Sequence, residues 1–214
     1  MPVLGASAVL LALVLGAGLL TLAGCLPEGT APSDRRYAAM PLTCARSADL
    51  ARDAIAAFAG PLHDPRQAPI EQSWREDNYY DENSGFPILS CRWEYRADAV
   101  GVEPGGPILR TVYLKFERYR NAATATGRID HWADSALHRS ATAHRLPEIG
   151  DGGYVSDRPS GPTGTADLTF RSSNLLVGVH VGEENKGAPA PEWQHRRTGA
   201  GAIARAVAAG LQQR

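Results

Sequence analysis

The first 24 residues have the pattern of a segment that is separate from the folded domain. They carry no charged side chain, and an apolar run from Val9 to Leu15 leads to the small-residue end Leu22-Ala23-Gly24-Cys25. Such a segment is typical of a cleaved export signal, although only the terminal amine supplies the positive charge usual before it. We predict a signal over residues 1–24. An uncleaved transmembrane helix is the alternative, because about 20 apolar residues can cross a bilayer.

The rest of the chain is long enough for one domain. Of 214 residues, 190 follow Gly24, which is an ordinary domain size with room for a core. Residues 26–42 hold three prolines and lack helical or strand periodicity, so we predict a flexible tether over 25–42 and a single domain over 43–214. The net charge is −1 without basic runs, which argues against nucleic acid as a partner.

Leu22-Ala23-Gly24-Cys25 resembles a bacterial lipobox. The resemblance implies that the Cys25 sulfur carries diacylglycerol, that the chain is cut before Cys25, and that the protein is held on the extracytoplasmic face of the cell membrane. One acyl chain holds a protein only marginally and two hold it stably, at about 0.8 kcal/mol for each buried CH₂ group. The membrane is therefore an expected partner through the lipid on Cys25.

The chain has three cysteines, an odd number that needs an explanation in an exported protein. No thiol is left over if Cys25 carries lipid and Cys44 pairs with Cys91. A bridge of this span stabilises the fold by roughly 4 kcal/mol in the chain-entropy model, and disulfides persist outside the cytosol. The alternative is two buried free thiols.

Alternating apolar and polar residues predict an antiparallel sheet. One strand is Ile88–Arg96, with Leu89, Cys91, Trp93 and Tyr95 inward, and after Pro104-Gly105-Gly106-Pro107 the next is Leu109–Tyr119. Two more strands carry their inward residues at 166–170 and 175–181. The acidic and aromatic residues 76–83 are predicted to form a solvated loop.

Helical periodicity adds three segments around these strands. Ser47 is predicted to cap the first helix, which ends at Gly60-Pro61, and Asn121 to cap a second that runs to Arg139. An amphipathic C-terminal helix places Ala200, Ile203, Ala204, Val207 and Leu211 inward, and Gly199 and Gly201 should weaken it. Together these elements predict the α+β class, an antiparallel sheet flanked by helices.

A second resemblance covers roughly residues 42–211. A cysteine near the first helix, Ser90-Cys91-Arg92-Trp93 on a strand and the Leu146–Tyr154 segment occur in this order. This pattern is similar to actinobacterial lipoproteins with a domain of unknown function, which include mycobacterial Lpq and Lpp proteins. Some of them are similar to a PsbP-like fold. The resemblance implies no catalytic residues.

The sequence offers little for catalysis. Gly-x-Ser-x-Gly, His-Glu-x-x-His and Ser-x-x-Lys motifs are missing. His131, Asp134 and His138 share one helix face, but the two histidines are about 10 Å apart along the axis, too far to share a metal easily. We expect a non-catalytic binding or accessory module without cofactor or metal, with an unidentified protein or small-molecule ligand. The alternatives are a carrier of a small or lipidic ligand between sheet and helices, and a metal-dependent hydrolase.

Overall fold

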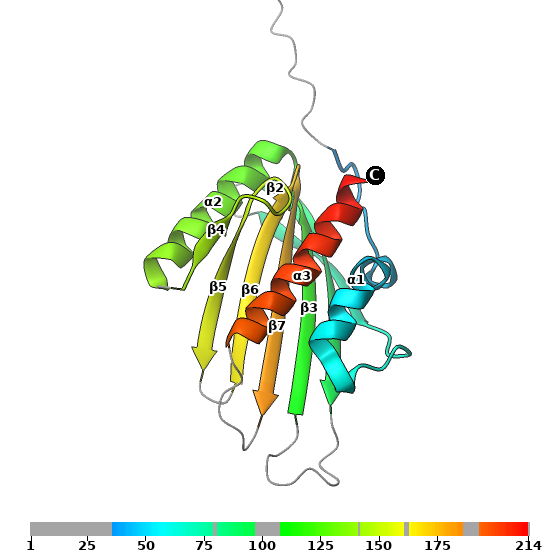
Figure 1. Ribbon diagram of the computed structural model, residues 1–214. Coiled ribbons are helices and arrows are strands. Elements are labelled where there is room, and N and C mark those ends of the chain that lie inside the picture. Colours follow the sequence, from blue (N-terminus) through cyan, green and yellow to red (C-terminus); the bar gives the residue numbers. More distant parts are fainter. Residues whose placement is uncertain are drawn as a thin grey trace, which may run out of the picture. The chain divides into compact units, whose positions relative to one another are not determined.

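The computed structural model describes residues 36–78, 81–96, 108–140, 142–160, 163–185 and 193–213. Residues Asp34–Arg214 form one compact unit (Figure 1). Its helices are α1 (Cys44–Ala59), the short 3₁₀ helix η1 (Gly60–Leu62), α2 (Ala122–Arg139) and α3 (Trp193–Gln212). Its strands are β1 (Ile70–Asn78), β2 (Asp81–Arg96), β3 (Ile108–Arg118), β4 (His144–Leu146), β5 (Gly153–Ser160), β6 (Thr163–Ser172) and β7 (Leu175–Asn185).

The strands form one seven-stranded sheet in the order β1-β2-β3-β7-β6-β5-β4. Every neighbouring pair is antiparallel. Consecutive hairpins account for β1-β2-β3 and for β4-β5-β6-β7, and the pairing of β7 with β3 joins these two halves in the centre. The predicted α+β class, with an antiparallel sheet flanked by helices, is confirmed.

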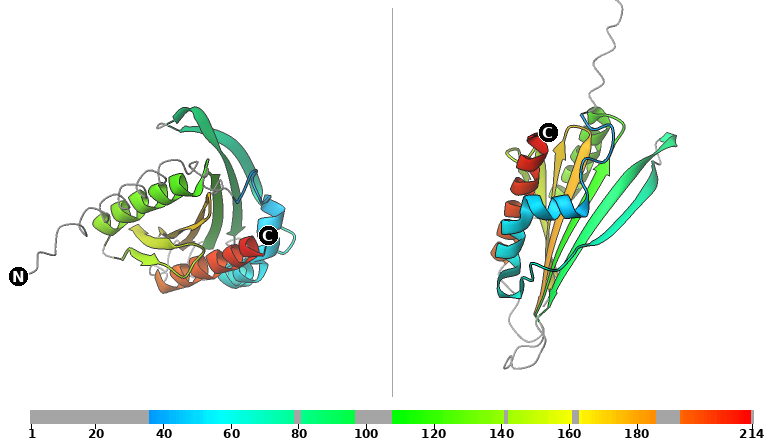
Figure 2. Two further views of the ribbon diagram at one scale, coloured as in Figure 1. Left: turned by 90° about the horizontal axis from the view of Figure 1, so that it is seen from above. Right: turned by 90° about the vertical axis from the view of Figure 1, so that its right-hand side faces the viewer.

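Helices cover both faces of this sheet (Figure 2). Alternate residues of each strand point to opposite faces, and the predicted inward residues of β2, β3, β6 and β7 all join the larger apolar core under α1 and α3. On the other face, α2 packs over a smaller apolar cluster near one end of the sheet. We call these the α1/α3 face and the α2 face.

Helices α1 and α3 pack closely because glycines of α3 leave room for side chains of α1. A Cβ atom on Gly199 would lie 2.5 Å from the Phe58 ring, and one on Gly210 would lie 2.5 Å from Leu50. The five predicted inward residues of α3 are all buried. Gly199 is unfavourable for an isolated helix, but its missing side chain permits this contact.

The end of α1 is held by charged groups of the sheet. Arg110 Nη1 donates to the carbonyl oxygens of Phe58 and Ala59 at 3.0 and 2.9 Å, where the last turn of a helix leaves its carbonyls unpaired. Arg110 Nη2 also donates to Glu183 Oε1 at 3.0 Å. On the other side of this carboxylate, His195 Nδ1 lies 3.3 Å from Glu183 Oε2.

Helix α2 begins and ends as predicted. The Asn121 side chain caps it by accepting from the backbone N–H of Thr124 at 2.8 Å, and the helix ends at Arg139. Its buried residues include Ala125 and Ile129, which pack with residues of β2, β7 and the β3–α2 connection: Phe86, Ile88, Tyr119 and Leu176.

Two predicted elements differ from the structure. The solvated loop expected over 76–83 is wrong, because β1 runs to Asn78 and β2 starts at Asp81; residues 79–80 lie outside the described part. The first helix is capped by Thr43, whose Oγ1 accepts from the Arg46 N–H at 3.2 Å. Ser47, the predicted cap, lies inside the helix and donates to the Thr43 carbonyl oxygen at 2.9 Å.

The segment just before α1 packs against the domain, although the predicted tether extends to residue 42. Tyr37 and Leu42 are buried in the larger core. The carboxamide of Asn174, in the turn between β6 and β7, accepts from the Tyr37 N–H and donates to the Tyr37 carbonyl oxygen, both at 3.0 Å. Arg36 Nη2 donates to the Leu211 and Gln212 carbonyl oxygens, each at 3.0 Å.

Candidate functional site

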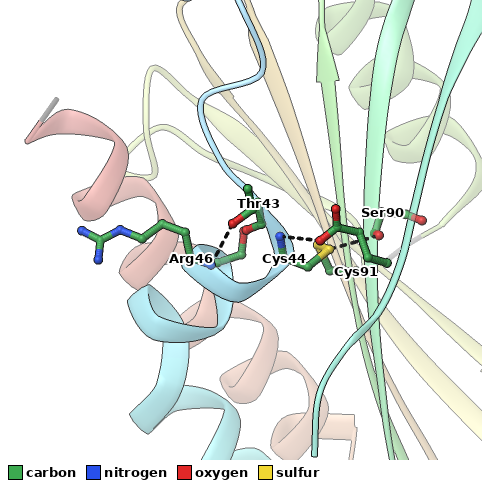
Figure 3. Close-up of a disulfide and its surroundings, with 7 residues drawn as sticks. Thr43, Cys44, Arg46, Ser90 and Cys91 are labelled. Atoms are coloured by element: carbon green, nitrogen blue, oxygen red, sulfur yellow. Dashed lines mark hydrogen bonds between the residues drawn. A yellow bond between two sulfur atoms is a disulfide. The ribbon is translucent and has the colours of Figure 1, made fainter.

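The predicted Cys44–Cys91 disulfide is present and buried. It joins the first residue of α1 to the middle of β2, with an S–S distance of 2.03 Å and a Cα–Cα distance of 5.3 Å (Figure 3). The Cys44 N–H donates to Glu71 Oε2 at 3.1 Å, so β1 is tied to the same helix end. The bridge and this hydrogen bond therefore hold the start of α1 against β2 and the edge strand β1.

A pocket of about 310 Å³ opens beside this bridge. Its walls come from three pieces of chain: α1, the segment after η1, and β2. The lining residues, in that order, are Ala48, Asp49, Arg52 and Ile55, then His63, Asp64, Pro65 and Gln67, then Trp93 and Tyr95.

The disulfide sets which residues of helix and strand face each other across the pocket. Ala48 and Arg52 follow Cys44 at intervals of four residues, which is a rise of about 6 Å each along a helix. Trp93 and Tyr95 follow Cys91 at intervals of two, a rise of about 6.6 Å each along a strand. All four residues line the pocket, within about two helical turns of Cys44 on α1 and within four residues of Cys91 on β2.

The floor of the pocket is aromatic and its rim is polar. Trp93 and Tyr95 are each 2% exposed, and Ile55 is also buried. The His63 ring lies over the floor with its centroid 5.8 Å from that of Tyr95. At the outer side, Gln67 Nε2 donates to the backbone carbonyl oxygen of Glu94 at 2.5 Å, which ties the segment after η1 to β2.

The charge in the pocket is not balanced. Asp49 pairs with Arg52 at 2.6 Å, so the positive charge of Arg52 is offset by its own helix neighbour. Burial, and after it the negative charge of Asp64, raises the pKa of Tyr95 to about 12. Tyr95 is therefore an uncharged phenol at neutral pH, and the field of Asp64 reaches the pocket floor.

The open part of the α2 face carries a second group of polar side chains. His180 Nδ1 lies 2.8 Å from Asp167 Oδ1, and the Tyr113 ring centroid lies 5.4 Å from that of His180. Nearby, Lys115 pairs with Glu117 at 2.7 Å. These residues form side-by-side pairs on the surface of the sheet.

The residues weighed for a metal site are not brought together. His131, Asp134 and His138 are all exposed on α2. Asp134 Oδ1 accepts from Arg145 at 2.7 Å, and the ring of His138 contacts the Asp134 backbone oxygen at 2.7 Å. Within the ranges that the structure describes, no group of three or more His, Cys, Asp or Glu side chains is placed to hold a metal ion.

Sequence reasoning found part of the pocket and missed the rest. It placed Trp93 and Tyr95 on the inward face of their strand but assigned them to the core alone. The segment with His63, Asp64 and Gln67 has no helical or strand periodicity, and its composition carries no signal of a site. The available signal was the cysteine pair, since the bridge aligns the two walls.

Cys25, the predicted lipidation residue, lies outside the described residues, as do the predicted signal over 1–24 and its alternative, an uncleaved transmembrane helix. Among the helices that the structure describes, none has the length and hydropathy needed to cross a membrane. Comparison with protein-family models, curated proteins and solved structures finds no match for this chain.

Proposed function

We propose that this chain is a lipid-anchored, extracytoplasmic binding protein that holds a small organic cation in the pocket between α1 and β2. The observation that carries the proposal is the pocket itself, which combines an aromatic floor with the carboxylate of Asp64 and lies near the Cys44–Cys91 disulfide. The protein acts by holding its ligand and not by converting it.

The place of action is supported by two independent features of the chain. A buried disulfide is maintained in oxidising compartments outside the cytosol. The uncharged apolar segment before Cys25 is suited to export, and a lipid on Cys25 would hold the domain at the membrane surface. These features support an anchored protein on the extracytoplasmic face.

The ligand class follows from the pocket's chemistry. Aromatic faces and a nearby carboxylate both attract a cation, and an ammonium group over such rings gains about 0.5–2 kcal/mol. Asp64 supplies the carboxylate, while Trp93 and Tyr95 supply the rings. A volume of about 310 Å³ is at the small end for ligand pockets, which favours a small amine over a lipid with two acyl chains.

Binding is tested on the full-length protein in detergent with two probes of similar size and opposite charge. We expect phenethylamine to raise the melting temperature with a saturable dose dependence, and phenylacetate to leave it unchanged. Equal shifts from both probes, or a shift from neither, would contradict the proposed ligand class. The intact mass of the protein from its native membrane tests the anchor: residues 1–24 should be lost and lipid should be attached to Cys25.

A matched pair of variants locates the site. Asp64→Asn keeps the shape of the side chain but removes its charge, so the response to phenethylamine should be lost. Asp53→Asn is the control, because Asp53 is exposed on α1 and is not among the pocket-lining residues. If both variants respond as the unaltered protein does, the amine binds elsewhere.

A further inference from the structure

Strand β1 is an open edge of the sheet. It is the outermost strand next to β2, and it has nine residues, whereas β4 at the opposite edge has three. In the part of the chain that the structure describes, no strand pairs with the outer side of β1. Figure 2 shows the β1–β2 hairpin reaching away from the helices. A long edge strand presents backbone donors and acceptors to another chain.

The side chains of this edge are accessible on both faces. Residues 70–75 are all exposed, and Ile70 and Trp74 are two of the three large apolar residues that are most exposed, at 56% and 40%. They lie on one face of the strand, and the charged residues Glu71 and Arg75 lie on the other. One exposed face of the edge is thus apolar and the other carries charges of both signs, with Glu71 Oε2 also accepting from the Cys44 N–H.

We propose that two copies of this chain pair through β1, antiparallel, with a two-fold axis at Ser73. The two sheets then form one continuous sheet. This inference does not depend on the ligand pocket or on the lipid anchor.

The charges of β1 select the position of the axis. In an antiparallel pair, two residues that lie directly opposite each other either both point their backbone N–H and C=O groups at the other strand or both point them away. Because these groups alternate along a strand, a two-fold axis between two copies of β1 must pass through a residue and not between two residues. With the axis at Ser73, Glu71 lies opposite Arg75 of the second copy, and the symmetry repeats this pair. Opposite charges in this position favour the pairing.

The apolar face agrees with the same axis. Trp74 then lies diagonal to both Ile70 and Trp74 of the second copy, a separation within reach of aromatic side chains. Moving the axis to Gln72 places Glu71 opposite Ser73, and moving it to Trp74 places Arg75 opposite Ser73. Either shift removes both direct charge pairs. The axis at Ser73 is therefore the one that gives favourable contacts on the charged face and on the apolar face.

The axis is tested by oxidative cross-linking of the full-length protein in its membrane. A Ser73→Cys variant places two new cysteines directly opposite each other, with their Cβ atoms about 4.5–5.5 Å apart, and should give a covalent dimer that a reductant separates. Gln72→Cys is the matched control, since its thiols face Trp74 of the other copy. We expect at least a fivefold higher dimer yield at position 73. A monomer at position 73, or equal yields, would overturn the proposal.

The charge pairing is tested on the Ser73→Cys background. Arg75→Glu and Glu71→Lys each place like charges opposite each other, and each alone should lower the dimer yield about tenfold. Mixing the two variants, one carrying a size tag, should restore a heterodimer, because opposite charges then face each other again. Glu71 also contacts the end of α1, so a thermal melt checks that its variant is folded. A mixture that stays monomeric, or single variants that still dimerise, would refute the assigned register.

Discussion

The α1/α3 face and the α2 face are built from alternate residues of the same strands, but they are packed differently. The first is apolar along most of β2, β3, β6 and β7 and carries the disulfide. The second is apolar only near α2, and beyond it the strands present residues such as Tyr113, Asp167 and His180. One face therefore supplies most of the stability, and the other tolerates polar groups because it is only partly covered.

The largest difference in stability between the two faces should appear when one buried phenylalanine is replaced by alanine on each face. Phe116 is fully buried on the α1/α3 face, and Phe86 is buried in the smaller cluster under α2. We expect Phe116→Ala to lower the free energy of unfolding by about 4–5 kcal/mol and Phe86→Ala by no more than about 3 kcal/mol. Urea unfolding measures both. Equal losses would mean that the two faces are packed equally well.

Removing the disulfide should cause the next largest loss of stability. Replacing Cys44 and Cys91 by serine frees a loop with a sequence separation of 47 residues, and we expect a loss of about 3–4 kcal/mol. The same variant should weaken binding of phenethylamine, because the walls of the pocket lose their alignment. Calorimetric melting and titration measure the two effects. An unaltered melting temperature would show that the bridge adds no constraint.

Substitutions of two arginines allow the contribution of a buried ion pair to be compared with that of exposed ion pairs. Arg110→Ala removes the donor to the carbonyls at the end of α1 and leaves the buried Glu183 with its contact to His195, so we expect a loss of about 3 kcal/mol. Arg145→Ala on the outer side of the α2 face removes exposed pairs with Asp130 and Asp134 and should cost less than about 1 kcal/mol. Chemical unfolding at low and high salt distinguishes the two losses, because added salt screens the exposed pairs of Arg145 and leaves the buried pair of Arg110 largely unchanged.

Each face also contains one buried tyrosine with an altered titration. Burial, and next the charge of Asp64, raises the pKa of Tyr95 to about 12; burial, and next Glu117, raises the pKa of Tyr119. An unfolded tyrosine ionises near pH 10, so stability that is present below pH 10 is lost as the pH rises toward 12. Tyr95 alone accounts for about 2 kcal/mol of this loss.

Tyr95→Phe and Tyr119→Phe should each flatten the alkaline decline in stability, measured by urea unfolding between pH 9 and 12. Absorbance titration of the folded protein follows the phenolates directly. A decline as steep in Tyr95→Phe as in the unaltered protein would show that this phenol does not contribute.

The parts of the fold predicted from sequence are those with one buried face. Strands β2 and β3 alternate because one side meets the core, and the cap of α2 is a local signal at Asn121. Strand β1 was missed because residues 70–75 are exposed on both faces, so burial imposes no period on them. The start of α1 was misplaced because serine and threonine are both favoured caps by residue type, with serine the better one, whereas Thr43 caps the helix and Ser47 lies inside it.

The candidate site was less predictable than the fold. Its floor follows from the alternation of β2, but its acidic residue, Asp64, lies in a connection without periodicity. The bridge joins α1 to β2, and the Gln67–Glu94 hydrogen bond joins the segment after η1 to β2. Such long-range alignment is set by tertiary structure and leaves no local pattern in the sequence.

The contacts of Arg36 and Tyr37 determine how the domain bears mechanical tension. A pull on the chain from its N-terminal side reaches the Asn174 carboxamide and the last carbonyls of α3 before it reaches α1. Asn174 also donates to the Tyr119 carbonyl oxygen at 2.9 Å, so the load spreads to the central strands. A pull on this end of the chain would therefore load several hydrogen bonds at the same time, and α1 would be reached only after they give way.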